Sequence, residues 1–359
     1  MRLAARTALW SAGLAGFLFL TVVVSAGIGP VPIDPLVIIQ VLLNALAVPT
    51  AIGSGSSGVA GVDLTFAPVF AFDVPETSRT IVLTIRLPRI LLGAIVGVSL
   101  AAAGAVMQGF FRNPMADPSI IGVSSGAAVG AVAAITLSAA LPFGLSLHTA
   151  AFVTGLLTAF GVYLIATEEG RTPVATLLLA GVAVQTFLGA VISYLLVQSG
   201  QSLQRAIFWL MGHLHNATWG EVEASLLAAP PLLLIMMVYS RDLNVLLLGE
   251  EDAQTLGIDV ERTKQILLGV SSLITAAAVA VSGVIGFVGL IVPHMMRLLV
   301  GPDHRILLPT SALAGGAFLV LADTVARSGP AELPVGIVTA ALGAPFFLYL
   351  LRRREVHAL

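Results

Sequence analysis

The chain alternates between long runs of apolar residues and short polar connections. About ten runs approach the roughly 20 residues that an α-helix needs to cross a bilayer. The pattern places them at Ala8–Ile28, Pro88–Met107, Ser119–Leu141, Leu147–Ala166, Val174–Val197, Ala224–Tyr239, Gln265–Val281, Val284–Leu299, Ile306–Ala322 and Val335–Leu351. The run from Gln265 to Val300 is too long for one span, and SGVIG at Ser282–Gly286 is the natural turn within it. The pattern therefore predicts an all-α polytopic membrane protein with about ten transmembrane helices.

The composition indicates that lipid is the solvent. Of the 359 residues, 57% are hydrophobic and only 10% are charged, against about 25% in soluble domains. The net charge of −2 argues against a nucleic-acid partner, and the lack of cysteine excludes disulfides, thiolate metal sites and cysteine nucleophiles. The first run follows Arg2 and Arg6 as in a signal peptide, but its length and the later spans favour an uncleaved helix. Residues 1–359 are therefore predicted to form a single transmembrane domain.

The basic residues orient the predicted helices. An even number of spans puts both termini on one side, and most of the 17 basic residues fall on that side. The positive-inside rule makes it cytoplasmic. Residues 29–80 then form a long outer loop, with a short interfacial helix in its apolar part and a flexible Gly- and Ser-rich stretch at Gly53–Gly61. Residues 241–264 form the longest cytoplasmic loop.

The sequence contains no recognisable catalytic constellation. It has no G-x-x-x-x-G-K-[ST] phosphate loop, no H-E-x-x-H motif and no Ser, His and Asp set that spacing supports, and Lys264 is the only lysine. We therefore predict no catalytic residue and no bound metal or cofactor. Ion-coupled carriers usually keep ionisable residues inside their spans, whereas nearly all acids here map to loops or helix ends, with Asp323 nearest to an intramembrane position. Secondary transport is disfavoured but stays an alternative.

The cytoplasmic loop at 241–264 is predicted to form two short amphipathic helices separated at Gly257. Its apolar residues are Leu246, Leu247, Leu248, Ala253 and Leu256, and the acids around them are Glu250, Glu251, Asp252 and Asp259. This pattern is compatible with a pair of helices on the membrane surface and with a docking surface for a cytoplasmic partner.

Two further stretches predict local structure. Asn113 and Asp117 in RNPMADP can cap the next helix through their side-chain oxygens. Gly93, Gly97 and Gly104 are expected to let helices approach closely within lipid.

From Arg86 onward, a series of motifs resembles the permease family of the ABC importers for iron chelates, haem and cobalamin. The motifs are RLPR at 86–89, GAVMQGFFRNPMADPSIIGVSSGA at 104–127, LLLAGVA at 177–183, GEEDAQTLG at 249–257, GFVGLIVPHMMR at 286–297, DHRILLP at 303–309, and ADTVAR with ELPVGIVTAALGAPFFLYLL at 322–351. They occur in the family's order and spacing. Residues 29–80 depart from the family pattern because this segment is longer.

The resemblance implies an assembly in a bacterial inner membrane. Two copies of this chain would form a homodimer, two cytoplasmic subunits would hydrolyse ATP with Mg, and a periplasmic binding protein would deliver the substrate. Substrate would pass along the dimer axis between the two copies of the fifth helix. This chain would then be no enzyme and would hold no cofactor of its own.

The resemblance also assigns roles to residues of this sequence. The residues implied to dock the binding protein through its glutamates are Arg86, Arg89 and Arg327. The residues implied to couple to the ATPase are Gly249, Glu250, Glu251, Ala253, Leu256 and Gly257. The cytoplasmic constriction would fall at the entry to the fifth helix, on Val174, Ala175 and Thr176.

His213 and His215 bear on the choice of substrate. They follow the fifth span on the outer side, and imidazole is a good ligand for haem iron. A histidine beside Trp209 and Trp219 in an interfacial loop is also ordinary. The pair favours haem as the substrate, with a ferric siderophore or cobalamin as the alternatives within the family.

Overall fold

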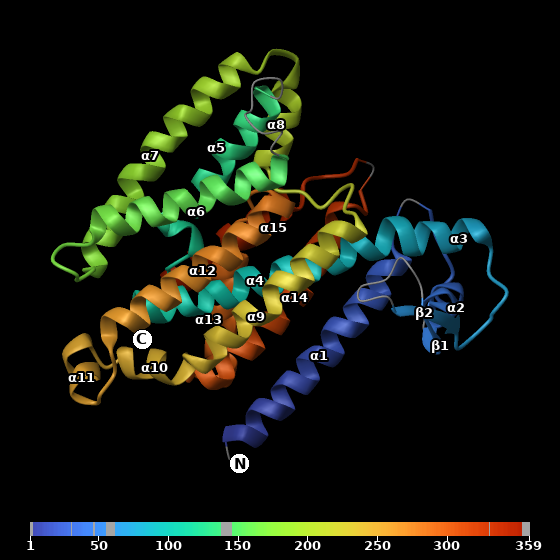
Figure 1. The fold of residues 1–359 in the computed structure, drawn as a ribbon, viewed down its shortest axis with the longest axis horizontal. Coiled ribbons are helices and arrows are strands. Elements are labelled where there is room, and N and C mark those ends of the chain that lie inside the picture. Colours follow the sequence, from blue (N-terminus) through green and yellow to red (C-terminus); the bar gives the residue numbers. More distant parts are fainter. Residues whose placement is uncertain are drawn as a thin grey trace.

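The computed structural model describes residues 3–29, 31–45, 47–54, 62–137, 146–329 and 331–353. Over these residues the protein is a bundle of helices that carries one small two-stranded sheet (Figure 1). The labels N and C both lie toward the end of the bundle that holds α10 (Ser240–Leu246) and α11 (Glu250–Thr255), whereas α3 (Glu76–Thr80) lies toward the other end (Figure 1).

The described residues contain seven helices that are long and apolar enough to cross a membrane. They are α1 (Leu3–Gly27), the continuous helix of α3, η2 (Ile81–Arg86) and α4 (Leu87–Phe110), α6 (Leu147–Ala166), α7 (Val174–Gln198), α9 (Trp219–Val238), α12 (Val260–Ser282) and α14 (His304–Ala326). Shorter apolar helices occupy the other three predicted spans, namely α5 (Val123–Thr136), α13 (Val288–Val300) and α15 (Val335–Arg353). The all-α polytopic fold is thereby confirmed, including the break between α12 and α13.

The second predicted span begins earlier than Pro88. The helix runs without interruption from Glu76 to Phe110, and its residues 81–86 are wound as a π-helix. Proline lacks the N–H that would bond to the carbonyl four residues earlier, and it usually marks a helix start. Here the wider π-turn immediately before Pro88 accommodates the proline ring, so the helix continues outward.

The third predicted span is shorter than expected. Helix α5 begins at Val123 instead of Ser119, because residues Pro118–Ile121 form the separate 3-10 turn η3. Asp117 caps this turn, and its carboxylate accepts a hydrogen bond from the Ser119 amide at 2.9 Å. Asn113 accepts one from the Met115 amide at 2.9 Å, so it stabilises the preceding turn and caps no helix. The predicted end at Leu141 lies outside the described residues.

Helix α4 runs through the centre of the bundle. In its most apolar window 83% of residues are buried, against 6% in α1 and 17% in α7. Helix α4 packs against α14, α12, α13 and α9. A methyl group at Gly97 would overlap the carbonyl of Gly315 in α14, and one at Gly104 would overlap that of Gly289 in α13. These two glycines therefore permit backbone contact between helices, as predicted, whereas Gly93 faces the side chain of a loop residue.

A second layer consists of α5, α6 and α7, which pack on one another beside the α4 group (Figure 1). Helix α12 lies between the two layers and contacts both α4 and α6. Helix α7 leaves one face uncovered, where Val197 is 82% and Leu179 is 71% exposed. Such an apolar face requires lipid or another protein chain to cover it.

The outer segment at 29–80 contains the predicted short helix as α2 (Pro35–Asn44), which Asp34 caps through the Leu36 amide at 2.7 Å. It also contains an unpredicted antiparallel pair of strands, β1 (Ala47–Ser54) and β2 (Val62–Pro68). Most of the Gly- and Ser-rich stretch at Gly53–Gly61 lies outside the described residues. The strands flank that stretch, and β1 contains Pro49 and Gly53, which are unfavourable in strands, so their pattern alone is too weak to indicate a hairpin.

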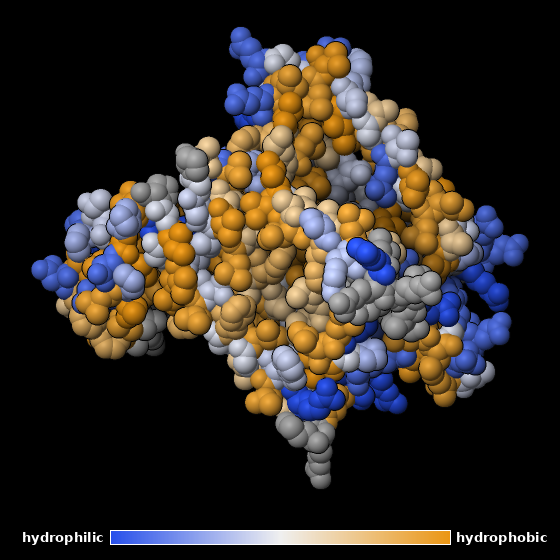
Figure 2. Space-filling view, turned by 180° about the vertical axis from the view of Figure 1, so that it is seen from behind, coloured by the Kyte–Doolittle hydropathy of each residue, from blue (hydrophilic) through white to orange (hydrophobic). Residues whose placement is uncertain are grey.

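The surface fits a protein that is surrounded by lipid. Seen from behind, apolar side chains cover most of the middle of the molecule, and hydrophilic residues gather at its extremities (Figure 2). Exposed apolar residues occur on several spans, including Leu227 of α9 at 81% and Phe19 of α1 at 70%.

Candidate functional site

The three arginines that were predicted to dock a binding protein lie together at one end of the bundle. Arg86 ends η2, Arg89 lies in the first turn of α4, and Arg327 follows directly on α14. They line a common cleft of about 470 Å³ together with Glu332. Residues far apart in the sequence thus form one charged cluster.

Two of these arginines, Arg86 and Arg327, donate hydrogen bonds to backbone carbonyls at the end of α1. The Arg86 Nη1 donates a hydrogen bond to the Ala26 carbonyl at 2.7 Å, and the Arg327 Nη1 donates one to the Ile28 carbonyl at 2.7 Å. Both side chains are buried, with exposed fractions of 4% and 6%. Since the last carbonyls of a helix lack partners within it, the two guanidinium groups cap the outer end of α1.

Arg89 is the more accessible member of the cluster. Its side chain is 12% exposed and pairs with the buried Asp323 of α14 and with Glu332, which is 49% exposed. Glu332 was not predicted as a member of this cluster, and it lies in the connection between α14 and α15. The docking role of the arginines stays a prediction. Among the four residues of this cluster, Arg89 and Glu332 are the two most exposed, at 12% and 49%.

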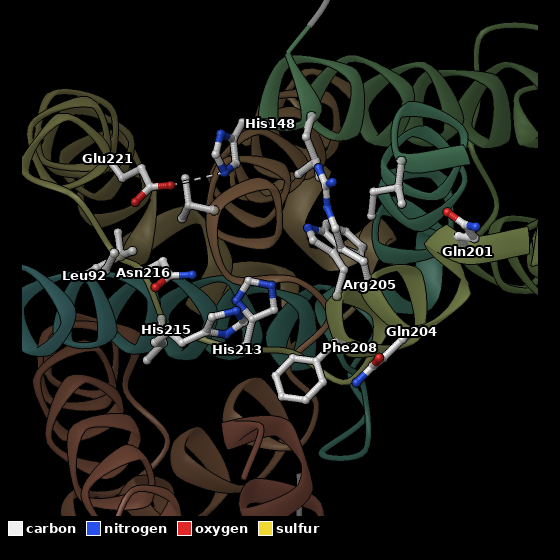
Figure 3. A pocket seen from close by; sticks show the side chains of 16 residues that line it. Leu92, His148, Gln201, Gln204, Arg205, Phe208, His213, His215, Asn216 and Glu221 are labelled. Carbon is white, nitrogen blue, oxygen red and sulfur yellow. Dashed lines mark ion pairs between the residues drawn. The ribbon is translucent and has the colours of Figure 1, made fainter. Parts of the chain in front are cut away.

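A larger cleft of about 610 Å³ opens beside this cluster (Figure 3). Its wall is formed by α8 (Leu203–Leu210), by the loop that follows α8, and by the outer ends of α6 and α9. His213 and His215 project into it from the loop. The His213 amide donates to the Ser282 carbonyl at 2.7 Å, which holds the loop against the break between α12 and α13.

The two histidines contact each other, with ring centroids 4.2 Å apart, and the Phe208 ring packs edge-on against His215. Burial and the neighbouring His215 lower the pKa of His213 to about 4, and burial also lowers the pKa of His215. Their Nδ1 atoms have no hydrogen-bond partner in the part of the chain that the structure describes. Near neutral pH the imidazoles are therefore uncharged.

Other residues of this cleft were not predicted. His148 of α6 pairs with Glu221 of α9 at 3.2 Å across one side of the cleft (Figure 3). The remaining polar residues of the wall are Gln201, Gln204, Arg205 and Asn216. The described residues hold no group of three or more His, Asp or Glu with the geometry of a metal site.

At the opposite end of the bundle, the cytoplasmic loop differs from the prediction. Its two short helices, α10 and α11, are separated at Leu247–Gly249, where Gly249 has a φ of 123°, and not at Gly257. The turn at Gly257 instead separates α11 from α12, which begins as early as Val260. The amphipathic pattern continues into α12, so the sequence did not reveal that this helix already belongs to a span.

The predicted apolar face of this loop is divided into two parts. Leu246 and Ala253 are buried and pack with Val260 inside the protein. Leu248 and Leu256 point outward, each with 62% of its surface exposed. The acidic Glu251 is also exposed on α11. Only the outward part is accessible to a partner. Ala253, which was predicted to couple to the ATPase, is instead part of the protein interior.

The residues predicted to form a constriction lie in the first turn of α7. Helix α7 begins at Val174 directly after Pro173, and Ala175 is exposed while Val174 and Thr176 are half-buried. This first turn is adjacent to the uncovered face of α7. Its role as a gate stays a prediction.

Comparison with known proteins identifies related chains. The profile of the FecCD transport family matches residues 17–353. A cobalamin import system permease protein from Halobacterium salinarum is 57% identical over 366 residues, which cover 99% of each chain. A hemin transport system permease protein from Yersinia pestis is 40% identical and covers 90% of this chain and 98% of its own. A solved structure of a metal-chelate type ABC transporter in an inward-facing conformation matches 96% of this chain and 98% of its own, with a TM-score of 0.77 at 32% identity.

Proposed function

Because the chain belongs to the FecCD transport family and is a multi-pass permease of the ABC importer type, we propose that it carries a metal-bearing tetrapyrrole across the cytoplasmic membrane, with cobalamin as the substrate. The observation that carries the choice of cobalamin is the 57% identity with a cobalamin permease over 99% of both chains. The hemin permease shares 40% over a smaller part of this chain.

The outer cleft supports a ligand of this kind. Gln201, Gln204 and Asn216 offer amide donors and acceptors, which complement the amide groups around a corrin ring. Phe208 offers aromatic surface to the ring itself. A pocket that combines aromatic surface with a few placed polar groups is typical of sites for small molecules.

Haem is the second candidate, and the pair of His213 and His215 favours it. Uncharged imidazole is a common axial ligand of haem iron, and Arg205 at the same cleft suits a propionate. Cobalamin also carries a metal that imidazole can ligate. The substrate choice therefore has to be measured for the two ligands side by side.

The proposed assembly has this chain as one of two copies, with the uncovered face of α7 along the dimer axis. Two separate subunits that hydrolyse ATP with Mg would bind at α10 and α11, and a binding protein would bind at the cluster of Arg89 and Glu332. This chain would then hydrolyse no ATP itself. The exposed Leu248 and Leu256 support the position of the ATPase, since apolar residues surrounded by acids at a surface are typical of a protein contact.

Uptake measurements test the proposal. The chain, its ATPase and its binding protein are reconstituted in proteoliposomes, and uptake of labelled cyanocobalamin, haem and a ferric siderophore is followed with and without ATP. We expect ATP-dependent uptake of cobalamin that excess haem inhibits weakly. If haem is taken up in preference to cobalamin, haem becomes the proposed substrate. Uptake that a protonophore abolishes while ATP is present would support the secondary carrier instead.

A further inference from the structure

Lys264, the only lysine of the chain, lies buried where three segments meet on the cytoplasmic side. Its Nζ is 2.8 Å from the Glu250 Oε1 of α11 and 3.1 Å from the Glu261 Oε1 of its own helix, α12. It also donates to the Thr172 carbonyl at 3.2 Å. Thr172 lies in the connection between α6 and α7, two residues before α7 begins.

Three oxygen atoms surround the ammonium group. It donates hydrogen bonds to the Glu261 carboxylate and to the Thr172 carbonyl, and it forms an ion pair with Glu250. The Lys264 side chain is 5% exposed, and a charge so deep is tolerated only when it is paired and fully hydrogen-bonded. The planar fork of arginine has no equivalent of this three-way arrangement, so the position is specific for lysine.

Thr172 is held from both sides of its backbone. Its carbonyl accepts from Lys264, and its amide donates to the Glu261 Oε2 at 3.2 Å. The residue is 1% exposed, so water does not substitute for either contact. The pair of Lys264 and Glu261 on α12 thus fixes the backbone immediately before the first turn of α7.

The other end of the cluster lies at the surface that was assigned to the ATPase. Glu250 begins α11, between the exposed Leu248 and Leu256. The cluster therefore connects α11 to the predicted constriction at Val174 through one ammonium group. A displacement of α11 by a partner has to break this ion pair or move Lys264, and with it the backbone of Thr172.

We propose that Lys264 is the positioning residue that transmits movement of α11 to the start of α7. This proposal rests on the proposed function, because it assumes that an ATPase moves α11 and that α7 controls the passage. In this proposal, movement of Glu250 with α11 displaces Lys264, and Lys264 displaces the backbone of Thr172. Glu261 orients both.

The test compares Lys264→Met with a matched control. Methionine keeps most of the apolar stem but removes the ammonium, and Arg262→Met removes a cation two positions away whose side chain is exposed. In proteoliposomes, we expect Lys264→Met to bind the ATPase and support hydrolysis within about twofold of the unmodified complex, while substrate uptake per ATP falls about tenfold or more, as for the loss of a typical coupling energy. Arg262→Met should change neither quantity.

A spin label reports the movement directly. Because the chain has no cysteine, Arg171→Cys places one label per copy at an exposed position beside Thr172. We expect the distance between the two labels to change on ATP binding, and Lys264→Met to abolish that change. Glu250→Gln, which retains Lys264 and its contacts with Glu261 and Thr172, should reduce it and serves as the second variant if Lys264→Met fails to fold.

The outcomes separate the two hypotheses. An unchanged label response and normal uptake in Lys264→Met or Glu250→Gln would overturn the role of Lys264. Hydrolysis and uptake that fall by the same factor would assign Lys264 to folding or assembly only. Failure of the unmodified chain to bind an ATPase would overturn the proposed function instead.

Discussion

Arg89 of α4 binds both carboxylate oxygens of Asp323 in α14, with Nε 2.9 Å from Oδ2 and Nη2 2.7 Å from Oδ1. Asp323 is 2% exposed, and Arg327 lies 3.5 Å from its Oδ2 on the other side. The carboxylate is thus shared between two cations. Asp323 was the acid nearest to the membrane interior, and its two ion pairs give it a structural role.

We expect Asp323→Asn to destabilise the protein strongly. The substitution leaves two buried guanidinium groups beside a neutral amide, and breaking a buried pair from one side typically costs about 3–5 kcal/mol. Thermal unfolding in detergent measures the effect. The exposed Glu332→Gln is the matched control and should cost no more than about 1 kcal/mol. Equal transition temperatures for the two variants would contradict the structural role of Asp323.

The docking prediction requires a different variant than the sequence alone would indicate. Charge reversal at Arg86 or Arg327 would remove the cap of α1 and disturb the fold. Arg89→Gln removes the accessible charge, and we expect it to weaken binding of the binding protein about tenfold, as for a charged group at an interface. Affinity of the unmodified pair should fall as salt rises, because surface charges are screened over about 8–10 Å at physiological ionic strength.

Binding in nanodiscs at several salt concentrations decides this point. Since Arg89 also holds Asp323, the unfolding temperature of Arg89→Gln has to be measured in parallel, and only a folded variant counts. Affinity that is flat across salt and equal in the folded variant would remove Arg89 from the interface.

For the cytoplasmic surface, Leu256→Arg should prevent the ATPase from co-purifying without changing the unfolding temperature. The side chain is 62% exposed, so the fold tolerates the charge, whereas an apolar contact with a partner does not. Leu256→Ala should reduce binding to a smaller extent. Normal co-purification of Leu256→Arg would place the contact elsewhere.

Because the pKa of His213 is lowered in the folded chain, we expect the free energy of unfolding to depend on pH. Its pKa is lowered to about 4 by burial, so the unfolded chain binds more protons than the folded chain between about pH 6.5 and pH 4. Stability contributed by the neutral imidazole is present above pH 6.5 and is lost as the pH falls, by up to about 2 kcal/mol at pH 5.

Unfolding is measured at pH 7 and pH 5 for the unmodified chain and for His213→Gln. The difference between the two proteins gives the contribution of His213 to the pH dependence of stability. The variant should lose less stability on acidification. A second pair of proteins, the unmodified chain and a variant that combines His213→Ala with His215→Ala, reports on the substrate. Ligation of haem by His213 or His215 shifts the absorption spectrum of haem, and the double variant should lack that shift. A spectrum that is the same in both proteins would assign the pair to the wall of the cleft alone.

The apolar runs predicted the spans well because the bilayer imposes composition and length on each segment separately. Helix α6 has the predicted bounds Leu147–Ala166, and α7 extends only one residue beyond its predicted end. The extension of α4 past Pro88 and the separate turn before α5 depend on local backbone geometry, which hydropathy does not report.

The sites were harder to predict because they combine distant segments. The outer cleft brings together His148, Arg205, His213 and Glu221, which come from three helices and a loop. Lys264 was visible as the only lysine, but its partners at Glu250 and Thr172 follow from the packing of α11 and of the connection between α6 and α7 against α12. The docking arginines were recognised by motif, while their internal acceptors at the end of α1 were not.

The glycine contacts of α4 restrict which helices can move relative to one another. Gly97 and Gly104 bring α4 into backbone contact with Gly315 of α14 and Gly289 of α13, so a shift that placed a neighbouring side chain at either contact would produce a steric clash. The layer of α5, α6 and α7 has no such tie to α4 and meets it mainly through the side chains of α12. We therefore expect the chain to divide into a stationary half around α4 and a mobile half that contains α7, with the passage opening and closing by displacement of the second half alone.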